Sequence, residues 1–184
     1  MPGGFRSGLT ASDGQRILSA SARAFMNVPV IQLLVLDVDG VLTPGDVTYD
    51  ETSQRVMSFH IHDGSAIKRW QSAGRHCAIL SGRQSPIVDR RASELGIQHV
   101  MQGVACKERE WRGLLSRLEL PAGSSCCIGD DVGDLDIVRH CGFGVAVANA
   151  VPELKRWAAY ITRRPGGQGA VAEVAEWLLR HESK

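Results

Sequence analysis

The most informative segment of this sequence is an apolar run that ends in two aspartates. Residues 31–36 are almost continuously hydrophobic, and Asp37 and Asp39 follow them directly, with Gly40 next. A strand that is apolar on both sides suits the centre of a parallel sheet that helices cover on both faces. The run therefore predicts a central strand with acidic side chains at its carboxyl end.

Apolar strand-like segments and helical segments alternate along the rest of the chain. Further strands are predicted at residues 76–80, 98–102, 126–128, 144–148 and 160–162. Helices are predicted at residues 64–72, 85–95, 107–118, 135–140, 152–157 and 170–180. The segments 46–50 and 55–61 are shorter, are rich in β-branched and aromatic residues, and predict a β-hairpin. The alternation predicts an α/β fold with a doubly wound parallel sheet and a small β-hairpin flap.

Length and composition indicate one globular domain. Of 184 residues, 43% are hydrophobic and 22% are charged, which is enough to build one core. We expect this domain to cover residues 28–184. Residues 1–27 form a Gly-, Ser- and Arg-rich extension without the continuous apolar region of a cleaved signal. Residues 16–26 could form a short helix or a frayed extension.

Charge, hydropathy and cysteine content exclude several classes of partner. The net charge is +1, so a nucleic acid is not expected as the partner. No run reaches the about 18 apolar residues of a membrane helix, so no membrane partner is expected. Five cysteines without a metal-type spacing indicate reduced thiols and a cytoplasmic location.

The residues that follow the predicted strands carry the chemistry. Ligands of doubly wound sheets bind beyond the carboxyl ends of the strands. The residues expected at this edge are Asp37, Asp39, Ser81, Arg83, Asp130, Asp131 and Asp134, with Lys107 at the start of a helix. Phosphoryl transfer uses this combination, because a divalent cation neutralises the carboxylates while cationic and hydroxyl groups hold the phosphoryl oxygens.

A purely structural role is the alternative for each acid, since an aspartate after a strand is often a helix or turn cap. Asp37 and Asp39, however, are two residues apart in an extended segment and point to the same side. Their carboxylates repel each other unless a cation or a proton lies between them. Asp130, Asp131 and Asp134 form a second acidic cluster in another loop. A purely structural explanation would require two such clusters to arise by chance, which favours the functional interpretation.

Four motifs resemble those of the haloacid dehalogenase superfamily. The first is the segment from Asp37 to Thr43, the second is residues 79–83 with Ser81, the third is Lys107, and the fourth is residues 129–134. They occur in the order of the superfamily and cover residues 31–147. A closer resemblance, over residues 31–180, is to the 3-deoxy-D-manno-octulosonate 8-phosphate phosphatases.

The spacing of the motifs leaves no room for a cap domain. One hairpin and one helix fill the segment from Asp39 to Ser81, and one helix and one strand fill the segment from Ser81 to Lys107. A phosphatase without a cap must shield its substrate from water in another way. The resemblance implies a homotetramer in which the hairpins form a barrel and neighbouring subunits close each other's sites.

The resemblance also implies roles for the site residues. Asp37 would attack phosphorus and form an aspartyl-phosphate, and Asp39 would act as acid and then as base. Mg²⁺ would be held by the Asp37 carboxylate, the Asp39 main-chain carbonyl and Asp130. Asp131 or Asp134 would complete the outer shell and pair with Lys107. Ser81 and Lys107 would hold the phosphoryl oxygens.

The expected substrate is a small sugar phosphate, most directly 3-deoxy-D-manno-octulosonate 8-phosphate or a related keto-sugar-acid phosphate. The substrate contacts implied by the resemblance are Asp39, His60, Ile61, His62, Asp63, Gly64, Lys68, Arg83, Arg91 and Lys107. Three positions depart from the pattern, because His62, Lys68 and Gln168 replace expected arginines. Losing the forked donors of arginine keeps a nonulosonate 9-phosphate open as an alternative substrate.

Two other functions fit parts of the pattern. A phosphoacceptor receiver domain also combines a parallel sheet, aspartates and a lysine, but it lacks the late acidic motif at residues 129–134. A catalytically silent protein that uses the same fold for binding or assembly is the second alternative. Hydrolysis of a phosphate monoester that depends on a divalent cation separates the enzyme from both.

Overall fold

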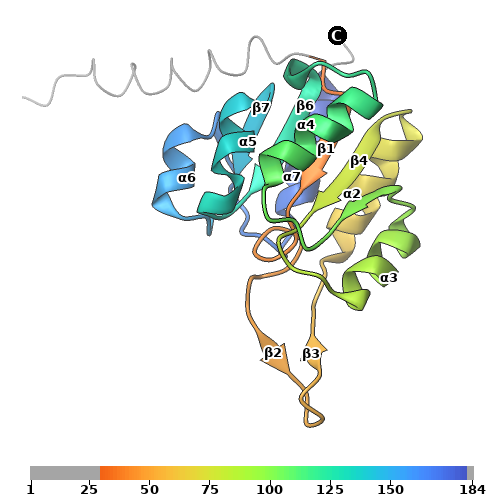
Figure 1. Cartoon of the computed structure of the whole chain (residues 1–184), viewed down its shortest axis with the longest axis vertical. Coiled ribbons are helices and arrows are strands. Elements are labelled where there is room, and N and C mark those ends of the chain that lie inside the picture. The colour runs from red at the N-terminus through yellow and green to blue at the C-terminus, as the bar shows by residue number, and fades with distance from the viewer. Residues whose placement is uncertain (1–29, 182–184) are drawn as a thin grey trace, which may run out of the picture.

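The computed structural model describes residues 30–181, which form a six-stranded sheet with helices on both faces (Figure 1). The strand order is β5-β4-β1-β6-β7-β8, and every neighbouring pair is parallel. The strands are β1 (Leu33–Leu36), β4 (His76–Leu80), β5 (His99–Met101), β6 (Ser125–Gly129), β7 (Phe143–Ala146) and β8 (Tyr160–Ile161). The chain builds outward from β1 in one direction and then in the other, which confirms the doubly wound sheet.

Strand β1 contributes to a core on each face of the sheet because successive side chains point to opposite sides. Leu34 and Leu36 pack in the core that α2 (Ile61–Ser72), α3 (Pro86–Leu95) and α7 (Ala170–His181) cover. Leu33 and Val35 pack in the core on the side of α4 (Lys107–Arg117) and α5 (Leu135–His140). The buried apolar run thus fixes β1 in the middle of the sheet, with its carboxyl end at the site.

The hairpin is shorter than the sequence suggests. Strands β2 (Thr48–Tyr49) and β3 (Arg55–Val56) pair in antiparallel fashion and project from the body of the molecule (Figure 1). The predicted strand over residues 55–61 is wrong beyond Val56, because residues 57–60 pair with no strand in the part of the chain that the structure describes. Helix α2 begins at Ile61, three residues before the predicted start, and His60 is its extended N-cap.

The remaining elements agree closely with expectation. The short α6 (Pro152–Trp157) and a 3₁₀ turn, η2 (Val132–Asp134), complete the edge of the sheet on the side of β6 and β7, and a second 3₁₀ turn, η1 (Ala122–Ser124), leads into β6. Within residues 30–181 there is no cap domain, and no helix has the length and apolarity that crossing a membrane requires. The helix considered for residues 16–26 lies outside the described residues.

Candidate active site

The site lies where three neighbouring parallel strands end. Strand β1 pairs with β4 on one side and with β6 on the other, and all three run in the same direction. Their last residues therefore lie at one edge of the sheet. Asp37, Ser81 and Asp130 each follow one of these strands directly, so the topology brings them together.

Three aspartates meet at this edge. Carboxylate oxygens of Asp37, Asp130 and Asp134 all lie within 4.8 Å of one another. Asp37 comes from the loop after β1, whereas Asp130 and Asp134 come from the loop and 3₁₀ turn after β6. Oxygen donors at this spacing suit a hard divalent cation such as Mg²⁺. The two acidic motifs, far apart in the sequence, thus form one cluster.

Lys107 links the two loops. Its Nζ donates to Asp37 Oδ1 at 2.7 Å and to Asp134 Oδ1 at 2.7 Å. Asp134 is therefore the partner of Lys107, and Asp131 instead accepts from the backbone N–H of Val132 at 2.8 Å and caps the 3₁₀ turn. Asp134 Oδ2 also accepts from the backbone N–H groups of Asp130 and Asp131, at 3.2 and 3.4 Å.

The cluster concentrates negative charge in a buried place. Burial raises the pKa of Asp37 to about 6, with a further contribution from the charge of Asp134, although Lys107 opposes the rise. Burial likewise raises the pKa of Asp130 to about 8, and the charges of Asp37 and Asp134 add to it. Burial alone would lower the pKa of Lys107, but Asp37 and Asp134 outweigh it and raise that pKa. One ammonium group does not balance three carboxylates, so the site favours a further cation.

Two glycines make room for the carboxylates. Gly40 has a φ of +84°, and a Cβ there would lie 2.0 Å from Asp130 Oδ2. A Cβ on Gly129 would lie 2.5 to 2.6 Å from the side chain of Asp134. Any larger residue at either position would displace a carboxylate of the cluster.

Asp39 contacts basic side chains of the hairpin and of the loop after β4. Its Oδ1 accepts a short hydrogen bond from Nη2 of Arg55 on β3, and Arg83 Nε lies 3.6 Å from its Oδ2. Arg83 was expected at the site from its position after β4, whereas Arg55 was not expected there. The sequence signal for Arg55 is a single basic residue on the hairpin that follows the first motif, and this signal is too weak to identify a site residue.

Ser81 is buried in the turn after β4, two residues before Arg83. Its hydroxyl accepts from the backbone N–H of Arg83 at 3.2 Å, and its own N–H donates to the Met101 carbonyl at 2.9 Å. These bonds fix the turn after β4. They hold the Ser81 hydroxyl at the carboxyl edge of the sheet.

Four of the residues predicted to contact substrate lie in the first turn of α2, and a fifth, His60, is its N-cap. Asp63 is buried, its Oδ1 accepts from the backbone N–H of Ala172 at 2.8 Å, and burial raises its pKa. A Cβ on Gly64 would lie 2.5 Å from Nη2 of Arg91, so helices α2 and α3 meet closely there. The rings of His60 and His62 lie 5.0 Å apart, and Ile61 is exposed.

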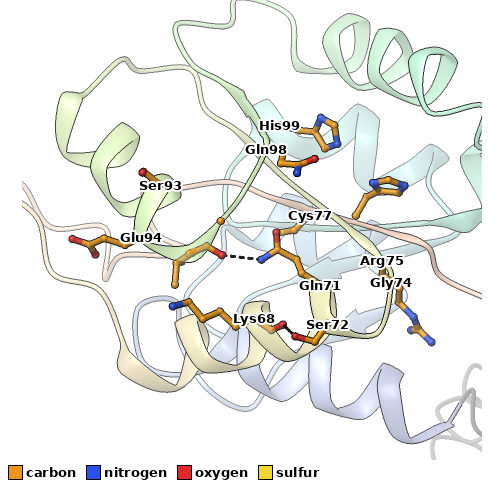
Figure 2. A pocket seen from close by; sticks show the side chains of 13 residues that line it. Lys68, Gln71, Ser72, Gly74, Arg75, Cys77, Ser93, Glu94, Gln98 and His99 are labelled. Atoms are coloured by element: carbon orange, nitrogen blue, oxygen red, sulfur yellow. Dashed lines mark hydrogen bonds between the residues drawn. The ribbon is translucent and has the colours of Figure 1, made fainter.

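Lys68 and His62 line two separate cavities, and the aspartates of the acidic cluster line neither of them. Lys68 lines a cavity of about 690 Å³ between α2 and α3, together with His76 and His99, which are the first residues of β4 and β5 (Figure 2). This cavity is therefore at the amino ends of the strands, opposite the acidic cluster. His62 lines a cavity of about 550 Å³ with basic side chains that include Arg163.

Comparison with known proteins places these features in a known family. The sequence model of the haloacid dehalogenase-like hydrolases matches residues 97–174. The chain is 37% identical to a 3-deoxy-D-manno-octulosonate 8-phosphate phosphatase of Haemophilus influenzae over 154 residues, which cover 84% of this chain and 86% of that protein. It is 36% identical to the enzyme of the same name from Escherichia coli K12 over 164 residues, covering 89% and 87%.

Solved structures show the same likeness in three dimensions. The crystal structure of 3-deoxy-D-manno-octulosonate 8-phosphate phosphatase from Moraxella catarrhalis, in complex with a magnesium ion, a phosphate ion and a KDO molecule, aligns with a TM-score of 0.81. Its sequence is 37% identical, and the alignment covers 89% of this chain and 91% of that one. A cobalt-bound Haemophilus influenzae phosphatase aligns with a TM-score of 0.80 at 37% identity, covering 84% and 90%.

Proposed function

The chain belongs to the haloacid dehalogenase-like hydrolases and is a phosphatase related to the 3-deoxy-D-manno-octulosonate 8-phosphate phosphatases, and from this premise we propose that it hydrolyses the phosphate ester of a small keto-sugar acid in the cytoplasm. The preferred substrate is 3-deoxy-D-manno-octulosonate 8-phosphate. One observation carries the proposal: Asp37 meets Asp130, Asp134 and Lys107 at the carboxyl edge of the sheet.

Asp37 is the proposed nucleophile. A carboxylate oxygen of Asp37 attacks phosphorus, the bond from phosphorus to the ester oxygen breaks, and an aspartyl-phosphate forms. Asp39 gives its proton to the departing oxygen of the sugar. Asp39 then takes a proton from water as the water oxygen attacks phosphorus, which releases inorganic phosphate and restores Asp37. Ser81 and Lys107 hold the phosphoryl oxygens during both steps.

The residues at the cluster fit Mg²⁺. Asp134 already accepts from Lys107 and from two backbone N–H groups, which leaves Asp37 and Asp130 as the carboxylate ligands, with the main-chain carbonyl of Asp39 as the third. The raised pKa values of Asp37 and Asp130 indicate repulsion that a bound cation relieves. When bound, Mg²⁺ supplies positive charge that lets an anionic ester approach the carboxylates.

We further propose a homotetramer in which hairpins from neighbouring subunits close the site. The described residues contain no cap, and apolar side chains of the hairpin are exposed, with Tyr49 64% accessible and Val47 50%. His62 and Lys68 line cavities that none of the aspartates of the cluster lines. We assign them, together with Arg83 and Arg91, to a substrate pocket that the assembled tetramer completes.

Phosphate release from a substrate panel tests the proposal. The panel holds octulosonate 8-phosphate, a nonulosonate 9-phosphate and a neutral hexose phosphate, each measured with Mg²⁺ and with EDTA. We expect the octulosonate ester to have the highest kcat/KM, EDTA to abolish turnover, and Asp37→Asn to lower kcat by about a thousandfold or more. Acid-quenched wild-type enzyme should carry one phosphoryl group on the peptide that contains Asp37.

The competing function is a silent binding or assembly protein of the same fold. It predicts no phosphate release from any ester of the panel, with or without Mg²⁺. Turnover that survives in Asp37→Asn would instead refute the covalent mechanism while leaving the phosphatase activity in place.

A further inference from the structure

Arg55 is a basic residue of the site for which neither the motifs nor the mechanism above supplies a role. It lies on β3 of the hairpin, and its side chain is 20% exposed. Its hairpin neighbours Tyr49 and Val56 are much more exposed. The hairpin therefore turns the Arg55 guanidinium inward, where Nη2 donates to Asp39 Oδ1.

The guanidinium of Arg55 has donor capacity that the described residues do not use. Its Nε is buried and has no hydrogen-bond partner among residues 30–181. Asp39, by contrast, is flanked by two guanidinium groups, because Arg83 lies 3.6 Å from its other oxygen. A buried donor without an acceptor is unfavourable, so this arrangement favours an additional oxygen atom beside Arg55.

A cavity next to Arg55 offers space for a group that carries such an oxygen atom. A cavity of about 260 Å³ lies between the base of the hairpin and residues 43–46, and Arg55 and Met57 line it. Asp46 also lines this cavity and adds a negative charge to its wall. Arg55 is the only cationic side chain among the described residues that line the cavity, so a carboxylate that enters it is attracted to Arg55.

We propose that Arg55 is a specificity-determining residue that moves from Asp39 to a carboxylate on the sugar part of the substrate. This inference rests on the proposed function and names the chemical group that the site selects. Asp39 acts on the ester oxygen between phosphorus and the sugar, so a group beside Asp39 on the hairpin side faces the sugar. The Asp39 oxygen that Arg55 holds must turn to the ester oxygen, and the released planar guanidinium matches a carboxylate.

Steady-state kinetics on two esters tests the inference. Octulosonate 8-phosphate carries a carboxylate, and glucose 6-phosphate is a neutral sugar ester of similar size. Arg55→Met should raise KM for the octulosonate ester by about tenfold or more, because a hydrogen bond between charged groups is lost. The kcat for this ester, and both constants for glucose 6-phosphate, should change by less than about threefold. Arg55→Lys, which keeps the charge without the fork, should give an intermediate KM.

Arg109→Met is the matched control, since Arg109 is 76% exposed on α4 and pairs only with Glu110 among the described contacts. It should leave both substrates unaffected. An equal loss of kcat/KM on the two esters, or a loss confined to kcat, would overturn the inference. Arg55 would then act only by orienting Asp39 or by stabilising the hairpin. If Arg55→Met unfolds at a lower temperature than the wild type, Arg55→Lys provides the test. The KM of Arg55→Lys relative to wild type is then compared between the two esters. A wild type that hydrolyses neither ester would refute the proposed function itself.

Discussion

Replacing Lys107 with methionine tests the electrostatic basis of the site directly. The side chain is 12% exposed, and its ammonium lies 2.7 Å from both Asp37 and Asp134, which are 9% and 8% exposed. At an effective dielectric constant of about 20, each of these contacts is worth about 6 kcal/mol, and carboxylates that lie within 4.8 Å of one another repel by at least about 3.5 kcal/mol. The cost of burying the lysine offsets much of this gain.

The net loss should match that of breaking a buried ion pair. We expect Lys107→Met to lower the free energy of unfolding by about 3 kcal/mol at pH 8.5 in EDTA. The pKa of Asp37 is about 6 and that of Asp130 about 8, both above the usual value for aspartate, so the folded state binds more protons than the unfolded state. Lowering the pH to 5 therefore protonates these carboxyls, and the loss should shrink to about 1 kcal/mol.

Urea unfolding of metal-free protein at the two pH values measures the difference. Arg112→Met is the matched control, because it removes an exposed ion pair with Glu108 on the same helix and should cost no more than about 1 kcal/mol at either pH. A loss in Lys107→Met that is the same at pH 5 and pH 8.5 would refute the reasoning, since it would show that packing, not charge, accounts for the effect.

Two further predictions concern the metal site. In metal-free wild type, the melting temperature should fall as the pH rises from 5 through 8, because the raised pKa values of Asp37 and Asp130 make the folded state more stable at low pH. Saturating Mg²⁺ should reverse this fall. A melting temperature in EDTA that does not change with pH would contradict the prediction. Gly40→Ala should weaken Mg²⁺ binding, measured by calorimetry, by about tenfold or more, because its Cβ would lie 2.0 Å from Asp130 Oδ2. Gly133→Ala is the control, since a Cβ at Gly133 meets nothing within 4 Å, and this variant should bind Mg²⁺ as the wild type does. Equal affinities of the two variants would contradict the argument that Gly40 makes room for Asp130.

Much of the fold follows from local patterns in the sequence. The buried run before Asp37, the alternation of strands and helices, and the ends of α5 and α6 were predictable because apolar periodicity and helix signals are local. The hairpin and the start of α2 were less predictable. Their limits depend on which residues find a pairing partner, and that is a property of the folded chain.

The site divides in the same way. The sequence by itself determined which chemical groups follow the strands, and hence that Asp37, Asp130 and Lys107 would reach one edge of the sheet, because parallel strands carry their carboxyl ends to the same side. Only the tertiary structure decided the pairings at that edge. It joins Lys107 to Asp134, turns Asp39 toward Arg55 on the hairpin, and places Lys68 at the opposite end of the strands. Side-chain directions depend on packing between distant segments, and no local pattern encodes them.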